Sequence, residues 1–172
     1  MLRLIPAPLH RLGLRAAHGL RRRWWRLAQV RLQGSRVLAF DALGQLLLIR
    51  HSYGSGSWML PGGGIGRRED PQAAALRELA EEVGLTLVNP RCFAVEDEPL
   101  YGTINRVHLF TGRAEGVLAI DGREIIEAAY FAPDALPADL SPALARGLPD
   151  WLGQAQYVPT VPTGRRGSIA PK

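Results

Sequence analysis

The feature that most constrains the fold is a short helix whose two ends are both marked in the sequence. Asp70 offers a side-chain acceptor for the first free amides of a helix, and Pro71 suits the first helical position. Gly84 favours the left-handed conformation in which helices commonly end. The sequence therefore predicts a helix over residues 71–83. Its apolar residues share one face, which we expect to be buried: Leu76, Leu79, Ala80 and Val83.

Three carboxylates crowd the other face of this helix. Glu78, Glu81 and Glu82 stand at i, i+3 and i+4. Like charges at this spacing destabilise a helix by roughly 0.2–0.5 kcal/mol per pair, whereas a divalent cation converts the repulsion into ligation. Oxygen ligands alone select a hard ion, so the cluster predicts Mg²⁺, with Mn²⁺ as the alternative. For three glutamates alone, a solvated acidic face is the competing interpretation.

The segment that contains this helix also matches a known motif. Residues 63–85 read GGIGRREDPQAAALRELAEEVGL and fit the pattern GX5EX7REUXEEXGU, in which U is apolar, at every specified position. The chain therefore resembles the Nudix hydrolases, and residues 58–64 resemble the lead-in that this family typically shows. The resemblance implies an α/β/α sandwich around a mixed β-sheet, and Mg²⁺-dependent hydrolysis of a diphosphate linkage.

The same resemblance implies roles for individual residues. Glu78 and Glu82 would be the principal metal ligands, and Glu81 a further ligand or the catalytic base. A carboxylate at the helix entrance would support them, an arginine would orient them, and two glycines would let the backbone approach metal and phosphate closely. These additional residues are Glu69, Arg77, Gly63 and Gly64.

Further candidates lie outside the motif. Arg50 ends a predicted buried strand beside the glycine-rich loop and is predicted to clamp the diphosphate, with an exposed strand end as the alternative. In many members of the family a base comes from a loop after the motif. Glu127 and Glu124 are the first candidates for that base. The weaker ones are Glu96 and Glu98.

Substrate specificity in this family lies outside the motif. Tyr101 resembles a tyrosine of diadenosine polyphosphate hydrolases, and Pro99 a proline of ADP-ribose hydrolases, so we expect Tyr101 to contact the substrate. The predicted substrate is a nucleoside diphosphate linked to another moiety, such as a nucleotide sugar, ADP-ribose or a dinucleoside polyphosphate. The alternatives are a nucleoside triphosphate pyrophosphatase of the pool-sanitising kind and a non-catalytic nucleotide-binding sensor.

The rest of the chain divides into one domain with two extensions. Residues 35–157 are predicted as the catalytic domain, residues 1–34 as a basic helical arm and residues 158–172 as a flexible tail. Apolar and β-branched runs between turn signals such as Pro99 and Gly102 predict the strands of the domain. The predicted strands are residues 36–41, 45–50, 92–96, 106–113 and 125–131, followed by a short helix over 142–148.

Basic charge is concentrated in the N-terminal arm. Residues 1–40 hold nine arginines and no acid, whereas residues 41–172 hold 12 basic and 16 acidic side chains, a net charge of −4. The acidic balance of the domain argues against specific nucleic-acid binding. Residues 9–27 have the apolar spacing of an amphipathic helix. This helix is predicted to pack on the domain or on the partner in a homodimer, or to lie on an anionic membrane surface.

Cysteine content and hydropathy indicate the compartment. Cys92 is the single cysteine, which excludes an intramolecular disulfide and fits a reducing environment. The chain has no apolar run of about 18 residues and no apolar signal-peptide stretch at its N-terminus. We therefore expect a cytoplasmic protein, peripheral to the membrane if the arm binds there.

Overall fold

The computed structural model describes residues 32–100, 102–120 and 122–155, and its centre is a five-stranded sheet in the order β3-β4-β1-β2-β5. Strands β1 and β4 run parallel, and the other neighbouring strands run antiparallel, so the sheet is mixed. The strands are β1 (Leu32–Phe40), β2 (Leu46–His51), β3 (Thr86–Leu100), β4 (Thr103–Glu115) and β5 (Ile125–Phe131), and the helices are α2 (Pro71–Val83) and α3 (Pro142–Ala155).

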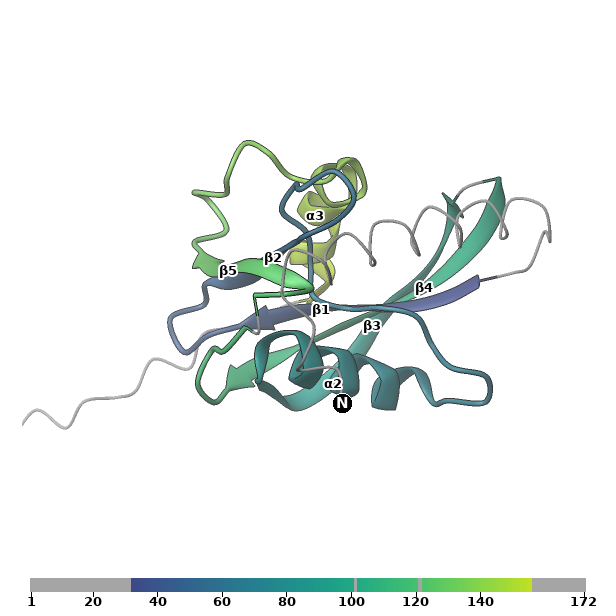
Figure 1. Cartoon of the computed structure of the whole chain (residues 1–172), viewed down its shortest axis with the longest axis horizontal. Coiled ribbons are helices and arrows are strands. Elements are labelled where there is room, and N and C mark those ends of the chain that lie inside the picture. The colour runs from purple at the N-terminus through teal and green to yellow at the C-terminus, as the bar shows by residue number, and fades with distance from the viewer. Residues whose placement is uncertain (1–31, 101, 121, 156–172) are drawn as a thin grey trace, which may run out of the picture.

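One helix covers each face of the sheet (Figure 1). Side chains alternate along β1, so that Val37 and Ala39 pack with α2 whereas Leu38 and Phe40 pack with α3. The two apolar clusters form a core on either side of the sheet. The predicted α/β/α sandwich is therefore confirmed.

The glycine-rich segment, residues 58–65, lies in a split between β1 and β2, which pair with each other only near the turn that joins them. The carbonyls of Pro61 and Gly63 accept hydrogen bonds from β1 amides, each 2.9 Å long, and β2 exchanges two more with this segment. Gly62 has a φ of +145°, and a Cβ on it would lie 2.1 Å from the carbonyl oxygen of Ser35. Main-chain bonds thus fix this segment in the sheet, and only glycine fits at its closest approach.

Local signals predicted the limits of α2 and β5. The Asp70 side chain accepts hydrogen bonds from the amides of Gln72 and Ala73, both 3.0 Å long, and Gly84 ends the helix with a φ of 71°. Strand β5 spans the seven residues that its apolar run predicts. The first and last residues of both elements are thus determined by residues within or next to the element.

Strands β1, β3 and β4 and helix α3 are longer than predicted, and in β3 and α3 a proline does not end the element. Pro99 lies within β3, opposite Ile104, rather than in a turn. Helix α3 continues through Pro149 to bury Trp151, which is 2% exposed. Burial of the large indole ring favours the longer helix in spite of the proline.

The N-terminal boundary also differs from the prediction. Strand β1 begins at Leu32, inside the segment assigned to the arm. Residues 9–27 lie outside the described part of the chain, so their predicted contacts with the domain, a homodimer partner or a membrane stay predictions. Among the helices of the described residues, none is long and apolar enough to cross a membrane.

Replacing Arg68 by glycine is expected to stabilise the protein. Arg68 has a φ of +68°. A non-glycine residue pays roughly 1–3 kcal/mol in this region, which exceeds the roughly 0.4–1 kcal/mol that glycine costs through the unfolded chain. Urea unfolding should therefore give Arg68→Gly a free energy of unfolding about 1 kcal/mol above the wild type.

The neighbouring exposed Arg67, which is outside the left-handed region, provides the matched control. Arg67→Gly gains no relief of strain and should be neutral or slightly destabilised. Equal effects of the two substitutions would contradict the strain at Arg68.

Candidate active site

Helix α2 carries three glutamates, of which Glu82 is buried and Glu81 is exposed. Ala75, Leu79 and Val83 are buried against the sheet. This anchoring turns Glu78 and Glu82 towards residues 62–64, whereas the Glu81 side chain is 62% exposed. The predicted helix face therefore meets the glycine-rich segment.

Arg77 holds three of the carboxylates. Its guanidinium donates to both oxygens of Glu69 at 2.9 and 3.1 Å, to Glu78 at 2.7 Å and to Glu81 at 3.3 Å. It also donates to the carbonyl of Gly64 at 3.3 Å. The hydrogen bond from Arg77 is the main reason why the pKa of Glu69 is lowered. The structure thus brings Arg77, Glu69, Glu78, Glu81 and Gly64 together.

Glu82 is the buried carboxylate of the cluster. Its side chain accepts a hydrogen bond of 2.9 Å from the Gly62 amide, and its other oxygen lies 3.5 Å from Nε2 of His51. Burial, followed by the charges of Glu78, Glu124 and Glu81, raises the pKa of Glu82 to about 8, although the Gly62 hydrogen bond opposes this shift. The ionised form of Glu82 is therefore unfavourable in the folded protein.

Glu78 packs tightly against the glycine-rich segment. A Cβ added to Gly63 would lie 2.5 Å from the carboxyl carbon of Glu78. Burial is the largest cause of the raised pKa of Glu78, and Arg77 opposes it. The absence of a side chain at Gly63 thus lets this carboxylate lie directly on the loop backbone.

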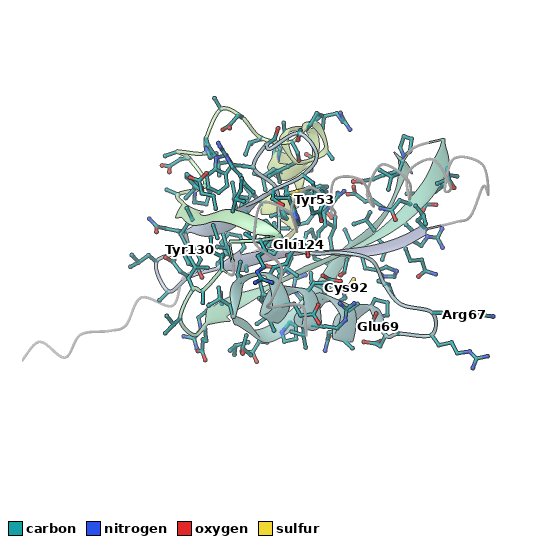
Figure 2. All side chains as sticks on the ribbon, viewed as in Figure 1. Tyr53, Arg67, Glu69, Cys92, Glu124 and Tyr130 are labelled. Carbon is teal, nitrogen blue, oxygen red and sulfur yellow. The ribbon has the colours of Figure 1, made fainter. Side chains whose placement is uncertain are left out.

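Glu124 joins the cluster from the residue before β5. Its carbonyl accepts a hydrogen bond of 2.8 Å from the Ser52 amide, and its carboxylate accepts one of 2.7 Å from the Tyr53 hydroxyl. Figure 2 labels Tyr53 and Glu124 where these side chains meet. After burial, the charge of Glu124 adds to the raised pKa of both Glu78 and Glu82. Glu124 is therefore the fifth carboxylate of the cluster, after Glu69, Glu78, Glu81 and Glu82.

The structure does not bring Arg50 and Glu127 to this cluster. They pair across β2 and β5, with Nη1 of Arg50 3.5 Å from the Glu127 carboxylate. Arg50 also ion-pairs with Asp139, and its guanidinium lies 4.6 Å from the ring centroid of Trp58, which belongs to the core on the α3 side. Strand alternation thus turns both side chains away from α2.

The remaining candidates also lie apart from the cluster. Glu96 accepts a hydrogen bond of 2.7 Å from the indole of Trp151, and Glu98 forms a two-point ion pair with Arg36. Both contacts join residues that lie far apart in the sequence, and we therefore assign them a structural role. Tyr101 lies outside the described residues, so its predicted contact with substrate stays a prediction.

Two residues of the cluster were not predicted, namely His51 and Tyr53. The alternation of side chains along β2 could have predicted the position of His51. Leu47 and Ile49 pack with α2, and His51 is the next residue on that face of the strand. Tyr53 lies in a loop, where no such periodicity applies. Its position depends on the distant Glu124.

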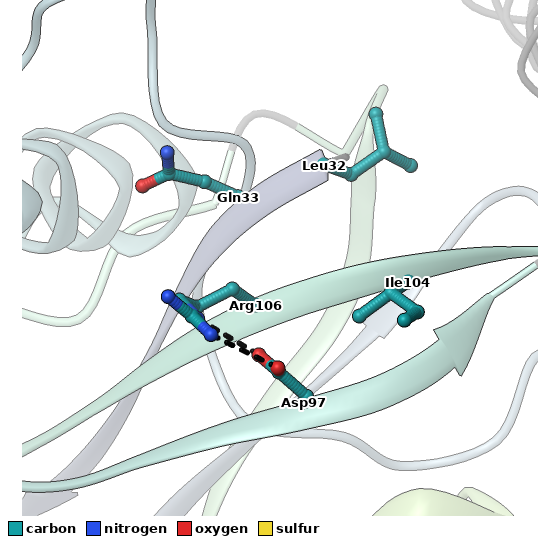
Figure 3. Close-up of a pocket in the computed structure, with 5 residues that line it drawn as sticks. All are labelled: Leu32, Gln33, Asp97, Ile104 and Arg106. Carbon is teal, nitrogen blue, oxygen red and sulfur yellow. Dashed lines mark hydrogen bonds and ion pairs between the residues drawn. The ribbon is translucent and has the colours of Figure 1, made fainter. Parts of the chain in front are cut away.

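A separate shallow pocket of about 160 Å³ opens on β1, β3 and β4 (Figure 3). Across it, Arg106 and Asp97 form an ion pair with an Nε–Oδ1 distance of 2.8 Å. Its walls contain none of the clustered glutamates and consist of Leu32, Gln33, Asp97, Ile104 and Arg106. We therefore take the carboxylate cluster, and not this pocket, as the candidate active site.

The cluster offers oxygen ligands to a cation, although its side chains are drawn to Arg77. Within the described ranges, no three potential ligands converge on one point. Carboxylates of equal charge separate and pair with the nearest cation, which here is Arg77. The oxygen donors of the cluster suit a hard cation, and its carboxylates can transfer a proton, but the described side chains are not arranged as a metal site.

The family comparison decides the identity of the chain. The protein-family model described as "NUDIX domain" matches residues 30–152 of the sequence. The chain is a Nudix hydrolase. It is 31% identical over 127 residues to the putative 8-oxo-dGTP diphosphatase of Bacillus subtilis (strain 168), covering 73% of this chain and 83% of that protein. The predicted resemblance and the enzyme class are confirmed.

Two further similarities refine the comparison. This Nudix hydrolase is 40% identical over 52 residues to an RNA pyrophosphohydrolase of Rhodospirillum rubrum, a match to 30% of this chain and 32% of that protein. The crystal structure of a MutT NUDIX hydrolase from Burkholderia pseudomallei has a TM-score of 0.63 and 25% identity, covering 70% of this chain and 97% of that one. The fold similarity thus extends over 70% of this chain and almost all of the other.

Glu82 should make the metal-free protein less stable as the pH rises. The folded-state pKa of about 8 exceeds the ordinary value of 4.5, so the folded protein retains a proton that the unfolded chain releases. This contribution to stability is present below pH 4.5 and is lost as the pH approaches 8. In EDTA, Glu82→Gln should therefore gain a few kcal/mol over the wild type between about pH 5 and pH 8.

Urea unfolding at the two pH values measures this difference. Glu81→Gln is the matched control, because it removes an exposed carboxylate from the same turn. Parallel pH dependence in the wild type and Glu82→Gln would refute the assignment of the effect to Glu82.

Proposed function

We propose that this Nudix hydrolase splits a nucleoside triphosphate into a nucleoside monophosphate and diphosphate, with Mg²⁺ as cofactor and Mn²⁺ as a substitute. The observation that carries the reaction type is the buried Glu82 among further carboxylates beside the Gly62–Gly63 backbone. The substrate class is supported by similarity to the putative 8-oxo-dGTP diphosphatase. Similarity to this relative favours a nucleoside triphosphate, which was our alternative prediction, over a nucleoside diphosphate linked to another moiety.

The residues fit a divalent cation. All donors are oxygens, a buried carboxylate with raised pKa gains from a neighbouring positive charge, and the missing Cβ of Gly63 leaves the backbone close to Glu78. Glu78 and Glu82 would be the principal ligands, with Glu81 as a further one. When bound, the cation would neutralise phosphate oxygens and make a water molecule more acidic.

We assign the proton of the attacking water to Glu124. As the water oxygen forms its bond to phosphorus, the bridging P–O bond breaks, diphosphate leaves and the carboxylate accepts the proton. Glu124 comes from a different element than the α2 ligands, and its charge acts on both Glu78 and Glu82. Glu81, the other candidate base, is ion-paired with Arg77.

Arg77 is a positioning residue in this mechanism. Its five guanidinium donors suit the simultaneous orientation of several carboxylates, and here it contacts three. Glu69 anchors this guanidinium from the loop at the helix entrance. The pair thereby holds Glu78 and Glu81 together against their mutual repulsion.

Glu124→Gln is expected to lower kcat by roughly 10²–10⁴-fold, the usual contribution of a general base, with little change in KM. Steady-state kinetics with a nucleoside triphosphate and Mg²⁺ measures both constants. Glu127→Gln is the matched control, because it makes the same chemical change three residues away on the α3 side. A large loss in Glu127→Gln with full activity in Glu124→Gln would reverse the assignment.

A substrate panel tests the reaction itself. Nucleoside triphosphates should release diphosphate in a Mg²⁺-dependent reaction, with higher kcat/KM than nucleotide sugars, ADP-ribose or dinucleoside polyphosphates. RNA with a 5′-triphosphate belongs in the panel because of the RNA pyrophosphohydrolase relative. Preference for a linked diphosphate would favour our other predicted class. Binding without turnover of any substrate would instead favour the sensor.

A further inference from the structure

Three consecutive residues, His51 at the end of β2 and Ser52 and Tyr53 after it, contact two carboxylates of the cluster. At one end, Nε2 of His51 lies 3.5 Å from the carboxylate of Glu82. At the other end, the Tyr53 hydroxyl donates a hydrogen bond of 2.7 Å to Oε1 of Glu124. Between them, the Ser52 amide donates to the Glu124 carbonyl at 2.8 Å. Glu124 is therefore held by this segment through both its main chain and its side chain.

The Tyr53 ring has a defined orientation. Its centroid lies 4.9 Å from that of the His51 imidazole, with an angle of 41° between the planes. The His51 side chain is itself only 10% exposed. Because a buried imidazole limits the rotation of the phenol, the hydroxyl is directed at Glu124 at a small cost in conformational entropy.

The phenol orients a carboxylate without adding a charge. Arg77, which holds Glu69, Glu78 and Glu81, brings a full positive charge into the cluster. A tyrosine hydroxyl is a neutral donor, and here it donates to Oε1 of Glu124. Such a donor suits a carboxylate that must accept a proton, because the phenol fixes its direction without forming an ion pair with it.

We propose that Tyr53 is the positioning residue for Glu124 and that it fixes the direction in which this carboxylate meets the attacking water. This inference rests on the proposed function, because Glu124 needs an orientation only if it acts in the reaction. Tyr53 itself does not touch the reacting atoms. Its effect is on the geometry of proton transfer, and therefore on kcat rather than on substrate binding.

The test combines single variants with a double-mutant cycle. Tyr53→Phe removes only the hydroxyl and is expected to lower kcat about 10-fold with KM unchanged, a part of the roughly 10²–10⁴-fold effect of a base. In the Glu124→Gln background, the same substitution should cause no further loss, because its target is already absent. Tyr130→Phe is the matched control, since Tyr130 lies on β5 and packs beside the α2-side core.

A second measurement examines the contact without turnover. Ultraviolet resonance Raman difference spectra of wild type minus Tyr53→Phe should report a phenol that donates to a carboxylate, and this signal should change in Glu124→Gln. Circular dichroism of each variant checks that the fold is retained.

Three results would overturn the inference. An unchanged kcat in Tyr53→Phe, in an enzyme that needs Glu124, overturns it while the proposed function stands. An equal loss from Tyr53→Phe with and without Glu124 shows that the hydroxyl acts elsewhere. Absence of turnover by the wild type across the substrate panel overturns the proposed function, and the inference with it.

Discussion

The main-chain hydrogen bonds that hold residues 58–65 between β1 and β2 are the constraint on which the site depends. They fix three consecutive glycines beside α2, and each glycine has its own contact there. The amide of Gly62 binds Glu82, the backbone of Gly63 touches Glu78 and the carbonyl of Gly64 accepts from Arg77. The geometry of the carboxylates is thus set by peptide groups, which cannot rotate away as side chains do.

The cluster separates two tasks that carboxylates perform. Glu69, Glu78 and Glu81 contact the guanidinium of Arg77, which limits their repulsion. Glu82 instead lies against a peptide N–H in a buried place, where its charge is costly. In this site, Arg77 partly neutralises the charge of three carboxylates, whereas ionised Glu82 would be stabilised by a bound cation.

Features that depend on contacts between residues close in the sequence could be predicted, and features that depend on contacts between distant residues could not. The limits of α2 depend on Asp70 and Gly84, which act within a few residues, and they were predicted correctly. The face on which Arg50 and Glu127 lie depends on the pairing of β2 with β5, which is a long-range contact that the sequence around each residue does not reveal. Tyr53 and Glu124 are 71 residues apart, so only the fold brings them together. The length of α3 likewise depended on the burial of Trp151 against strands far along the chain.

The burial of Glu82 has a consequence for folding as well as for catalysis. A ligand that binds the native state and not the unfolded chain stabilises the native state by mass action. Because the ionised Glu82 is costly in the folded protein and cheap in the unfolded chain, the folding equilibrium is coupled to the free concentration of any cation that the cluster binds. With the Mg²⁺ binding that we propose, the free energy of unfolding of this enzyme would depend on the free Mg²⁺ concentration, and a chelator would lower it.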